Sequence, residues 1–337
     1  MRYFRRLDGL ARRVVTCVAA AVVLFAGLVL PRPAHAAEDF DAWLANMKQE
    51  ALAAGITQAT VDAAFKDVQP IPKVLELDQR QPEFTLKLAD YLARNVNDKK
   101  VEQGRAAFSR NRELLTRVAA RFHVQPRFIV ALWGIESAYG RSMGSYSEIG
   151  SLATLAYDGR RSAYFKGELI AALKILDQEK IEPEQMLGSW AGAMGQCQFM
   201  PSSFLKFAVD FDGDGRRDIW HSEADVLAST ANYLAETGWR DDETWGRPVT
   251  LPASFDVSQA DLSITKPLGE WRGRGVKRSD GGELPGRAAM PASIMLPEGE
   301  TNSAYLVYGN FRSIMKWNRS TFFAIAVGVL ADRIGDR

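Results

Sequence analysis

The sequence predicts a mainly α-helical protein with a small antiparallel β region inserted late in the chain. Apolar residues recur at three- and four-residue spacing in several segments before residue 245 and again after residue 320, which is the period of amphipathic helices. Between Gly246 and Ser303, Gly and Pro are frequent and short alternating runs appear, which favours strands. The 337 residues, 47% hydrophobic and 25% charged, indicate a globular protein with one large core and an appended lobe.

The first 36 residues are expected to be a signal peptide that directs export to the periplasm. Five arginines lie within the first 13 residues, an apolar run covers Val14 to Leu30, and Ala34-His35-Ala36 provides a cleavage site after Ala36. An uncleaved anchor is the alternative, because the apolar run is just long enough to span a bilayer. Cys17 lacks the preceding small residues of a lipidated cysteine, so we do not expect a lipoprotein.

The charge balance changes when this segment is removed. Residues 1–36 hold six of the 42 basic and one of the 41 acidic residues, so 36 basic and 40 acidic residues remain, a net charge of −4. This balance argues against nucleic acid as a partner. Only His123 and His221 remain, so a metal site or a serine triad built on histidine is poorly supported. Cys197 is the single remaining cysteine and cannot form an intrachain disulfide.

A helical lobe is predicted for residues 37–120 and a catalytic core for residues 121–245. The lobe's apolar periodicity is carried by Phe40, Trp43, Leu44 and Met47, and later by Leu114, Leu115, Val118 and Phe122. In the core, the spacing predicts one helix from Phe128 to Gly140, preceded by Pro126, and another from Ala163 to Glu179. The second helix should bury Phe165, Leu169, Leu173 and Leu176.

The last part of the chain is predicted to leave the helical core and return to it. Alternating residues such as Val249-Thr250-Leu251 assign a small β region to residues 246–302. Residues 303–337 are assigned as a return to the core, because Ser320 to Ile334 is apolar and helical in its spacing.

Glu136 is an ionisable residue within an otherwise apolar helix end, Ala131 to Gly140. Desolvation by Trp133 and Ile135 and the negative end of the helix dipole are both expected to raise the pKa of its carboxyl group. A carboxyl group that is protonated near neutral pH suits general-acid cleavage of a glycosidic bond. The alternative is a glutamate that turns outward near a frayed helix end.

A second motif runs from Gly188 to Ser202. Three glycines within eight residues suggest a backbone that turns tightly or lets a ligand approach closely. Gln198 can donate and accept hydrogen bonds to a sugar hydroxyl or acetamido group. Taken alone, the segment could also be an ordinary loop that leads into a helix at Pro201.

Together these segments resemble the membrane-bound lytic murein transglycosylase B family over essentially the whole mature chain. The matching motifs are Glu136-Ser137-x-Tyr139-Gly140, Tyr157 to Phe165, Ala191 to Ser202, Asn232-Tyr233-Leu234 and Trp317-Asn318-Arg319-Ser320. The resemblance implies a lysozyme-like helical core with Glu136 as its sole catalytic carboxylate. It also implies a glycan groove lined by Ser189, Gln198, Tyr233, Asn318, Arg160, Arg161 and Tyr91. Phe323 departs from the family, since many relatives have tyrosine five residues after the asparagine.

The implied activity is cleavage of the β-1,4 bond between N-acetylmuramic acid and N-acetylglucosamine in peptidoglycan, with 1,6-anhydro ends as products. One alternative is a hydrolytic lysozyme with Glu148 or Asp158 as a second carboxylate. We interpret both as solvated loop residues, because neither lies in an apolar stretch. The other alternative is a peptidoglycan-binding protein without activity. Endo or exo action and stem-peptide preference are left open by the sequence.

An acidic loop within residues 210–225 matches the first half of a calcium-binding loop. Asp210, Asp212 and Asp214 occupy positions 1, 3 and 5, Gly215 occupies position 6, and Arg216 would offer its backbone carbonyl at position 7. His221 stands at position 12 in place of the usual glutamate, and the resemblance implies Asp225 as its substitute. Asp225 could also form a helix capping box with Ser222.

The expected ion is a structural Ca²⁺ or Na⁺, and no cofactor is expected for catalysis. The expected partners are peptidoglycan glycan strands and proteins of cell-wall synthesis. We expect a monomer.

Overall fold

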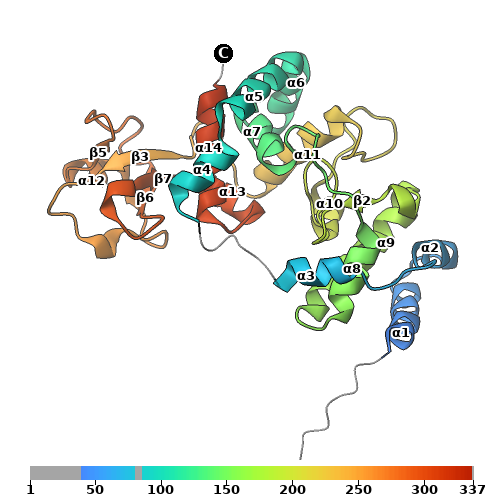
Figure 1. Cartoon of the computed structure of the whole chain (residues 1–337). Helices are drawn as coiled ribbons and strands as arrows, with labels where there is room; N and C mark the ends of the chain where they lie inside the picture. The colour runs from blue at the N-terminus through green and yellow to red at the C-terminus, as the bar shows by residue number, and fades with distance from the viewer. Residues whose placement is uncertain (1–38, 80–85, 336–337) are drawn as a thin grey trace, which may run out of the picture. The chain divides into compact units, whose positions relative to one another are not determined.

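Helices form most of the described chain, and Figure 1 shows their order. The computed structural model describes residues 39–79 and 86–335, which contain fourteen α-helices and seven short strands. The predicted signal peptide, its cleavage site after Ala36 and Cys17 lie outside these residues. Within the described part of the chain, no helix is long and apolar enough to span a bilayer.

Three N-terminal helices pack against the middle of the chain. They are α1 (Phe40–Ala53), α2 (Gln58–Ala64) and α3 (Pro72–Gln79). The predicted apolar stripe of α1 is buried, and the rings of Phe40 and Trp43 both contact Tyr157. Thr57 caps α2 and also donates a hydrogen bond to Asp177, 2.6 Å away, so polar as well as apolar contacts attach this part of the chain.

Helix α7 (Pro126–Ser137) lies at the centre of the helical core. It packs against α5 (Asp98–Arg110), α6 (Arg112–Phe122), α11 (Glu223–Glu236) and α14 (Thr321–Ile334). The sequence predicted this helix from Phe128 to Gly140, and both ends differ. Proline is accommodated in the first turn of a helix, so α7 begins at Pro126. It ends before Ala138, because Ala138 and Tyr139 adopt left-handed backbone conformations.

The middle of the chain contains three further helices and a two-stranded sheet. These elements are β1 (Tyr146–Ser147), α8 (Glu148–Tyr157), α9 (Ser162–Glu179), β2 (Leu187–Gly188) and α10 (Pro201–Phe207). β1 and β2 pair antiparallel, and α9 packs against α8 and α10. The predicted helix at Ala163–Glu179 is confirmed to within one residue, with its four predicted core side chains buried.

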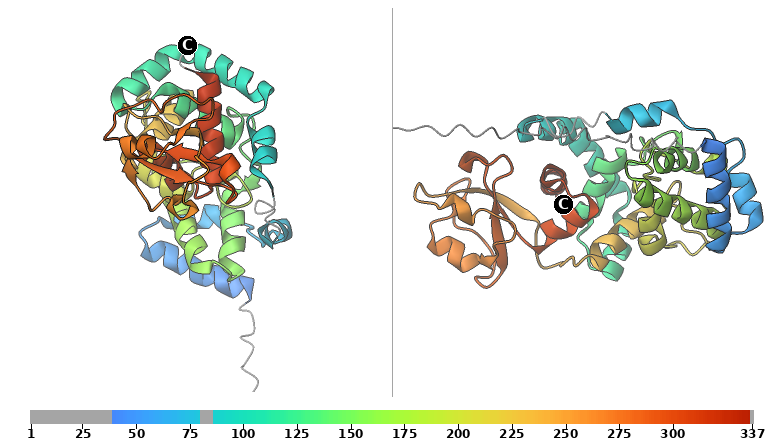
Figure 2. Two further views of the ribbon diagram at one scale, coloured as in Figure 1. Left: turned by 90° about the vertical axis from the view of Figure 1, so that its left-hand side faces the viewer. Right: turned by 90° about the horizontal axis from the view of Figure 1, so that it is seen from below.

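The late β region forms a five-stranded antiparallel sheet with its own small core. The strand order is β4 (Lys266–Pro267), β6 (Pro291–Met295), β7 (Tyr305–Val307), β3 (Gly246–Thr250) and β5 (Lys277–Arg278). Helix α12 (Leu268–Gly273) packs on it, and Leu268, Trp271 and Leu306 are fully buried there. Figure 2 shows these strands as a group beside the helices. Strand β7 comes from the segment that the sequence assigned to the C-terminal return, and the domain boundaries themselves stay predictions.

The chain returns to the helical core after the sheet. Helix α13 (Gly309–Trp317) is followed by α14, whose predicted helical span is confirmed and whose N-cap is Ser320. Helix α14 packs against α7, α5 and α4 (Leu88–Asn95). The last described helix therefore lies against the helix that carries Glu136.

Candidate active site

Glu136 is the penultimate residue of α7, and the backbone just after it reverses sharply. Ala138 and Tyr139 have φ values of 50° and 62°, and left-handed conformations cost residues with a side chain about 1–2 kcal/mol each. The reversal folds the Tyr139 ring back onto the helix, where its hydroxyl donates to the Lys100 carbonyl at 2.8 Å. Gly134 makes this possible, since a Cβ there would lie 2.6 Å from the ring. The buried ring thus fixes the helix end that presents Glu136.

Trp317, the last residue of α13, contacts Glu136 directly. Its indole Nε1 donates a hydrogen bond to Glu136 Oε1 at 2.7 Å. The indole ring packs against Tyr233 and Phe199, with ring centroids 4.6 and 5.1 Å away. The Tyr233 hydroxyl donates to the Lys316 carbonyl at 2.6 Å, which ties α11 to the end of α13. Tyr233 therefore supports the tryptophan that orients the carboxyl group of Glu136.

The charged surroundings of Glu136 include Lys100. Burial lowers the pKa of Lys100, the charge of Arg141 lowers it further, and the negative charge of Glu136 opposes both effects. Burial also raises the pKa of Cys197 to about 12, and the negative charges of Glu136 and Asp225 act in the same direction. The Cys197 thiol is therefore neutral near pH 7 and is no candidate nucleophile.

The segment from Gly188 to Phe199 is held by its own hydrogen bonds. Ser189 Oγ accepts the amide N–H groups of Ala191 and Ala193 at 3.3 and 3.0 Å. Gln196 links the segment to α7, because its Oε1 accepts the indole N–H of Trp133 at 2.8 Å. Gln198 has a left-handed backbone, with φ 49°, and its amide nitrogen donates to two backbone carbonyl groups. The segment is thus a structured loop in which Ser189 and Gln198 have defined positions.

Arg160 and Arg161 share one buried carboxylate. Asp78 is 3% exposed, its Oδ2 accepts Arg160 Nε at 2.9 Å, and its Oδ1 accepts Arg161 Nη2 at 2.6 Å. Burial raises the pKa of Asp78, but the hydrogen bonds and charges of the two arginines outweigh this and hold it below its ordinary value. The sequence proposed both arginines and did not identify the aspartate, which lies 82 residues earlier.

The other sequence-predicted groove residues have varied surroundings. Asn318 is exposed at the end of α13, and its Oδ1 accepts the Ser320 amide at 3.0 Å. Tyr91 is half-buried, with its ring edge-on to Phe322 at 5.8 Å. Phe323, where many relatives have tyrosine, lies in the first turn of α14 and is 4% exposed. Its ring is therefore buried in the core.

One of the two interpretations of solvated carboxylates is wrong. Glu148 was interpreted as a solvated loop residue, but it is the first residue of α8 and is completely buried. Its burial comes from the Gly188–Phe199 loop and α9, which lie far from it in the sequence. Asp158, by contrast, is exposed just after α8.

Three of the five proposed metal ligands converge. One carboxylate oxygen from each of Asp210, Asp212 and Asp214 lies within 4.8 Å of the others. Each carboxylate also accepts backbone N–H groups inside the loop, for example from Gly213 and Gly215 to Asp210 at 2.7 and 2.9 Å. Because Ca²⁺ prefers six to eight oxygen ligands at 2.3–2.6 Å, this arrangement suits such an ion.

Asp225 is not part of this convergent group. It is 1% exposed, and its two oxygens accept the amides of Phe211 and Asp218 at 2.7 and 2.8 Å, which closes the base of the loop. Burial raises the pKa of Asp225, and the two backbone hydrogen bonds counteract this rise. Ser222 caps α11 by accepting the Asp225 amide at 3.3 Å, which is one half of the expected capping box. The other half is not formed, because the Ser222 amide donates to the Asp218 carbonyl at 3.2 Å.

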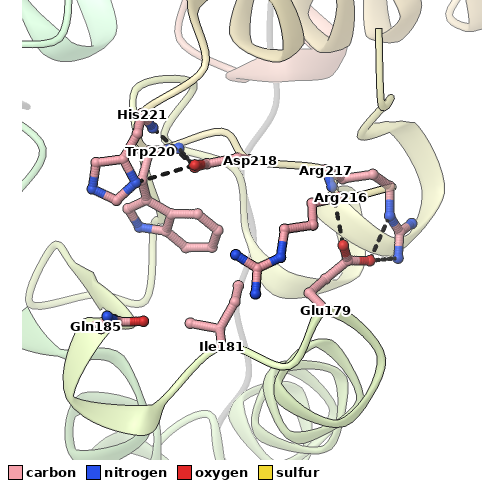
Figure 3. Close-up of a pocket in the computed structure, with 8 residues that line it drawn as sticks. All are labelled: Glu179, Ile181, Gln185, Arg216, Arg217, Asp218, Trp220 and His221. Carbon is pink, nitrogen blue, oxygen red and sulfur yellow. Dashed lines mark hydrogen bonds and ion pairs between the residues drawn. The ribbon is translucent and has the colours of Figure 1, made fainter. Parts of the chain in front are cut away.

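A pocket of about 70 Å³ lies beside the second half of this loop (Figure 3). The guanidinium group of Arg216 extends into it, while Arg217 pairs with Glu179, with its Nε 2.8 Å from Glu179 Oε1. The residues that line it are Glu179, Ile181, Gln185, Arg216, Arg217, Asp218, Trp220 and His221. None of the proposed glycan-binding residues is among them, so this pocket is separate from the surroundings of Glu136.

Comparison with known protein families matches residues 39–332 to the transglycosylase SLT domain. The chain belongs to this family. It is 32% identical over 259 residues to membrane-bound lytic murein transglycosylase B of Escherichia coli K12, a match that covers 72% of this chain and 66% of that protein. The chain therefore spans slightly less than two thirds of that relative. The resemblance drawn from the sequence motifs is confirmed.

Solved structures of the family share the fold. SltB3 from Pseudomonas aeruginosa, in complex with NAG-anhNAM-pentapeptide, superposes with a TM-score of 0.85 at 50% identity, covering 88% of this chain and 79% of that one. Escherichia coli Slt35 in complex with calcium gives a TM-score of 0.74 at 27% identity, covering 86% and 92%. The predicted fold class, a mainly helical lysozyme-like core with a small antiparallel sheet, is confirmed.

Proposed function

We propose that this chain is a lytic transglycosylase that cleaves the β-1,4 bond between N-acetylmuramic acid and N-acetylglucosamine, with Glu136 as acid and then base. The observation that carries the proposal is the hydrogen bond from Trp317 to Glu136 at a fixed helix end. Family membership supports the substrate class, and SltB3 at 50% identity has been solved with NAG-anhNAM-pentapeptide and with NAG-NAM-pentapeptide.

In the first step Glu136 protonates the glycosidic oxygen and the bond to the anomeric carbon breaks. The indole N–H of Trp317 faces Oε1, and we assign the acid hydrogen to Oε2. Glu136 gains negative charge as this proton leaves, and a hydrogen bond to a charged acceptor is stronger than one to a neutral acceptor. Trp317 therefore stabilises the transition state more than the ground state.

In the second step the Glu136 carboxylate takes the proton from the C6 hydroxyl of the same muramic acid. The C6 oxygen bonds to the anomeric carbon, which gives the 1,6-anhydro ring without consuming water. An internal hydroxyl competes well with water, because a correctly oriented intramolecular group has an effective concentration of up to about 10⁵–10⁸ M. The muramic acetamido group stabilises the positive charge at the anomeric carbon between the two steps.

The alternative of a hydrolase with a second carboxylate has little support. Glu148 is completely buried and packs against loop backbone, so it cannot contact a substrate or activate a bulk water molecule. Asp158 is exposed next to the arginine pair and its charge acts on Arg160. Ordinary glycosidases position two carboxylates on either side of the bond that breaks.

Binding of the glycan and its stem peptide is assigned to polar side chains around Glu136. Ser189 and Gln198 on the loop offer hydroxyl and amide groups to acetamido and hydroxyl groups of the sugars, and Asn318 does the same from the end of α13. Arg160 and Arg161 offer a positive pair to carboxylates of the substrate, and Tyr91 an aromatic face. Tyr233 acts mainly by supporting Trp317.

A structural cation fits the acidic loop. Asp210, Asp212 and Asp214 would hold it through carboxylate oxygens, with the Arg216 carbonyl as a further ligand, and the calcium complex of Slt35 supports this assignment. The ion would offset the repulsion among the three carboxylates and stabilise the loop. We also propose that residues 1–36 export the chain to the periplasm without a lipid anchor, and that the mature chain acts on glycan strands as a monomer.

Mass spectrometry of muropeptides released from purified sacculi tests the proposed reaction. We expect products that end in 1,6-anhydro-N-acetylmuramic acid, one water lighter than hydrolysis products and resistant to borohydride reduction. Mainly reducible muramic ends would show that water is the acceptor. No release from sacculi by a folded protein would instead favour a binding role.

A further inference from the structure

Glu148 is a completely buried carboxyl group at the first position of α8. Among the described residues, neither of its side-chain oxygens has a hydrogen-bond partner. Buried carboxyl groups are nearly always paired, so this one requires an explanation. None of the catalytic steps proposed above uses it.

The Glu148 carboxyl group packs against the underside of the loop that carries Ser189. A Cβ on Gly188 would lie 2.5 Å from Glu148 Oε2, and a Cβ on Gly192 would lie 3.3 Å from Oε1. The loop closes on itself between Ser189 and Ala193, with the Ser189 amide donating to the Ala193 carbonyl at 2.8 Å. The carboxyl group thus fills the space that two missing side chains leave beneath the loop.

The charged groups around Glu148 offer it no compensating cation. Glu168 on α9 faces it, and Glu168 itself accepts hydrogen bonds from the amide and hydroxyl of Ser202 at 2.9 and 2.7 Å. Residues 187–200 contain one ionisable side chain, the buried Cys197. Lys174 on α9 makes no ion pair among the described residues, and it is not among the groups whose charge acts on the pKa of Glu148. The remaining charged groups on the packed helices have partners elsewhere: Lys73 with Glu76, Asp78 with Arg160 and Arg161, Lys166 with Glu50, Asp177 with Thr57, Glu179 with Arg217, and Lys206 with the Phe207 ring.

These surroundings favour the uncharged form of the carboxyl group. Burial raises the pKa of Glu148 well above its ordinary value, and the negative charge of Glu168 raises it further. The N-terminus of α8 favours a negative charge at this position, but this effect is weak compared with the loss of hydration in a buried site.

We propose that Glu148 is a positioning residue whose uncharged carboxyl group supports the Gly188–Ala193 loop from below and so holds Ser189 in place for glycan binding. The effect on glycan binding rests on the proposed function. The support of the loop by Glu148 is a property of the fold and does not depend on that function.

The proposal makes the loop sensitive to pH in a defined direction. With the loop closed, the pKa of Glu148 is raised; with the loop lifted, water reaches the carboxyl group and its pKa returns to about 4.5. Closure is thus strongest below this ordinary value and weakens as pH rises toward the raised pKa of the closed form. Over that window the equilibrium constant for loop opening increases about tenfold per pH unit, since one proton is released on opening.

Amide hydrogen exchange of the loop measures this directly. We compare the wild-type protein with Glu148→Gln, a near-isosteric residue that cannot ionise, at the same pH so that intrinsic exchange rates cancel. From about pH 5 upward, the ratio of wild-type to variant exchange rates at Ser189, Gly192 and Ala193 is expected to rise about tenfold per pH unit until the raised pKa is reached. Amides in the centre of α9 are expected to show no such rise. A ratio for the loop that is independent of pH overturns the proposal.

Control variants show whether a changed exchange rate comes from a folding defect, and an activity measurement tests the proposed function separately. Glu184 is an exposed glutamate near the loop. The ratio of wild-type to Glu184→Gln exchange rates should therefore be independent of pH. If Glu148→Gln does not fold, Glu148→Met should also abolish the pH dependence. The wild-type protein alone gives the same slope once intrinsic exchange rates are divided out. In the activity arm, KM for glycan fragments should rise with pH more steeply in the wild type than in Glu148→Gln, with kcat changing less. A wild type without lytic activity refutes the proposed function and leaves the exchange result decisive for Glu148.

Discussion

Replacing Trp317 with phenylalanine removes the hydrogen-bond donor to Glu136 and keeps an aromatic ring. The lost bond is 2.7 Å long and its acceptor becomes charged as the glycosidic oxygen is protonated. Hydrogen bonds to charged groups contribute about 1.5–3 kcal/mol, and each 1.36 kcal/mol of transition-state stabilisation changes the rate about tenfold. We therefore expect kcat of Trp317→Phe to fall about 10- to 100-fold.

The packing contribution of the indole can be separated from its hydrogen bond. Trp317 lies against Tyr233 and Phe199, so the smaller ring should also lower the stability by about 1–3 kcal/mol. Phe207→Leu is the matched control, because Phe207 also packs against Tyr233, with ring centroids 4.5 Å apart, and a phenylalanine has no hydrogen-bond donor for Glu136.

Wall lysis is followed by the turbidity of purified sacculi, and stability by chemical denaturation. The control should lose stability with kcat close to that of the wild type. A Trp317→Phe variant with kcat within about twofold of the wild type would refute the assigned role of the indole donor.

Three further outcomes are expected. Glu136→Gln should abolish wall lysis and leave the melting temperature nearly unchanged, because the near-isosteric amide cannot transfer a proton; lysis at the wild-type rate by the purified variant would contradict this. Asp212→Ala combined with Asp214→Ala should abolish the stabilisation by calcium, which reaches about 2.7 kcal/mol at 100 times Kd and is measured by thermal melting with and without chelator. Asp78→Asn should lower the free energy of unfolding near pH 7 by about 1–2 kcal/mol, because one charged partner of two half-exposed arginines is removed. The pKa of Asp78 is lowered in the folded state, so its stabilisation is present above its ordinary value of 3.8 and is lost as pH falls through the lowered value. The wild type and Asp78→Asn should therefore converge in stability in strong acid, and a constant difference between them would contradict the assignment.

The sequence is informative wherever local periodicity decides the structure. The apolar spacing of α1 and α9 predicted each helix and its buried face, because these residues pack on one side of a regular helix. The apolar run at the C-terminal end predicted the span of α14. The shift to Gly, Pro and alternating residues likewise predicted the β region. Motif spacing placed Asp210, Asp212 and Asp214 in one loop, and their carboxylates do converge.

Interactions between distant segments were not predictable from these patterns. Trp317 lies 181 residues after Glu136, and the motif around it was noted without a role for the indole N–H. Glu148 was misinterpreted because Ser145 and Ser147 precede it, whereas its burial depends on a loop and a helix that follow later. The end of α7 was placed too late, because the two left-handed residues that end it are an alanine and a tyrosine, which carry no sequence signal for that conformation.

Glu136 depends on partners near the C-terminal end of the chain, and these partners are synthesised last. A growing polypeptide that has reached only the β region already contains Glu136, but it lacks both the indole partner and α14, one of the helices that pack against α7. The arrangement proposed for cleavage of the wall is therefore complete only in the final stage of synthesis. Under the proposed function, prematurely terminated molecules would carry the acid without the partner that orients it.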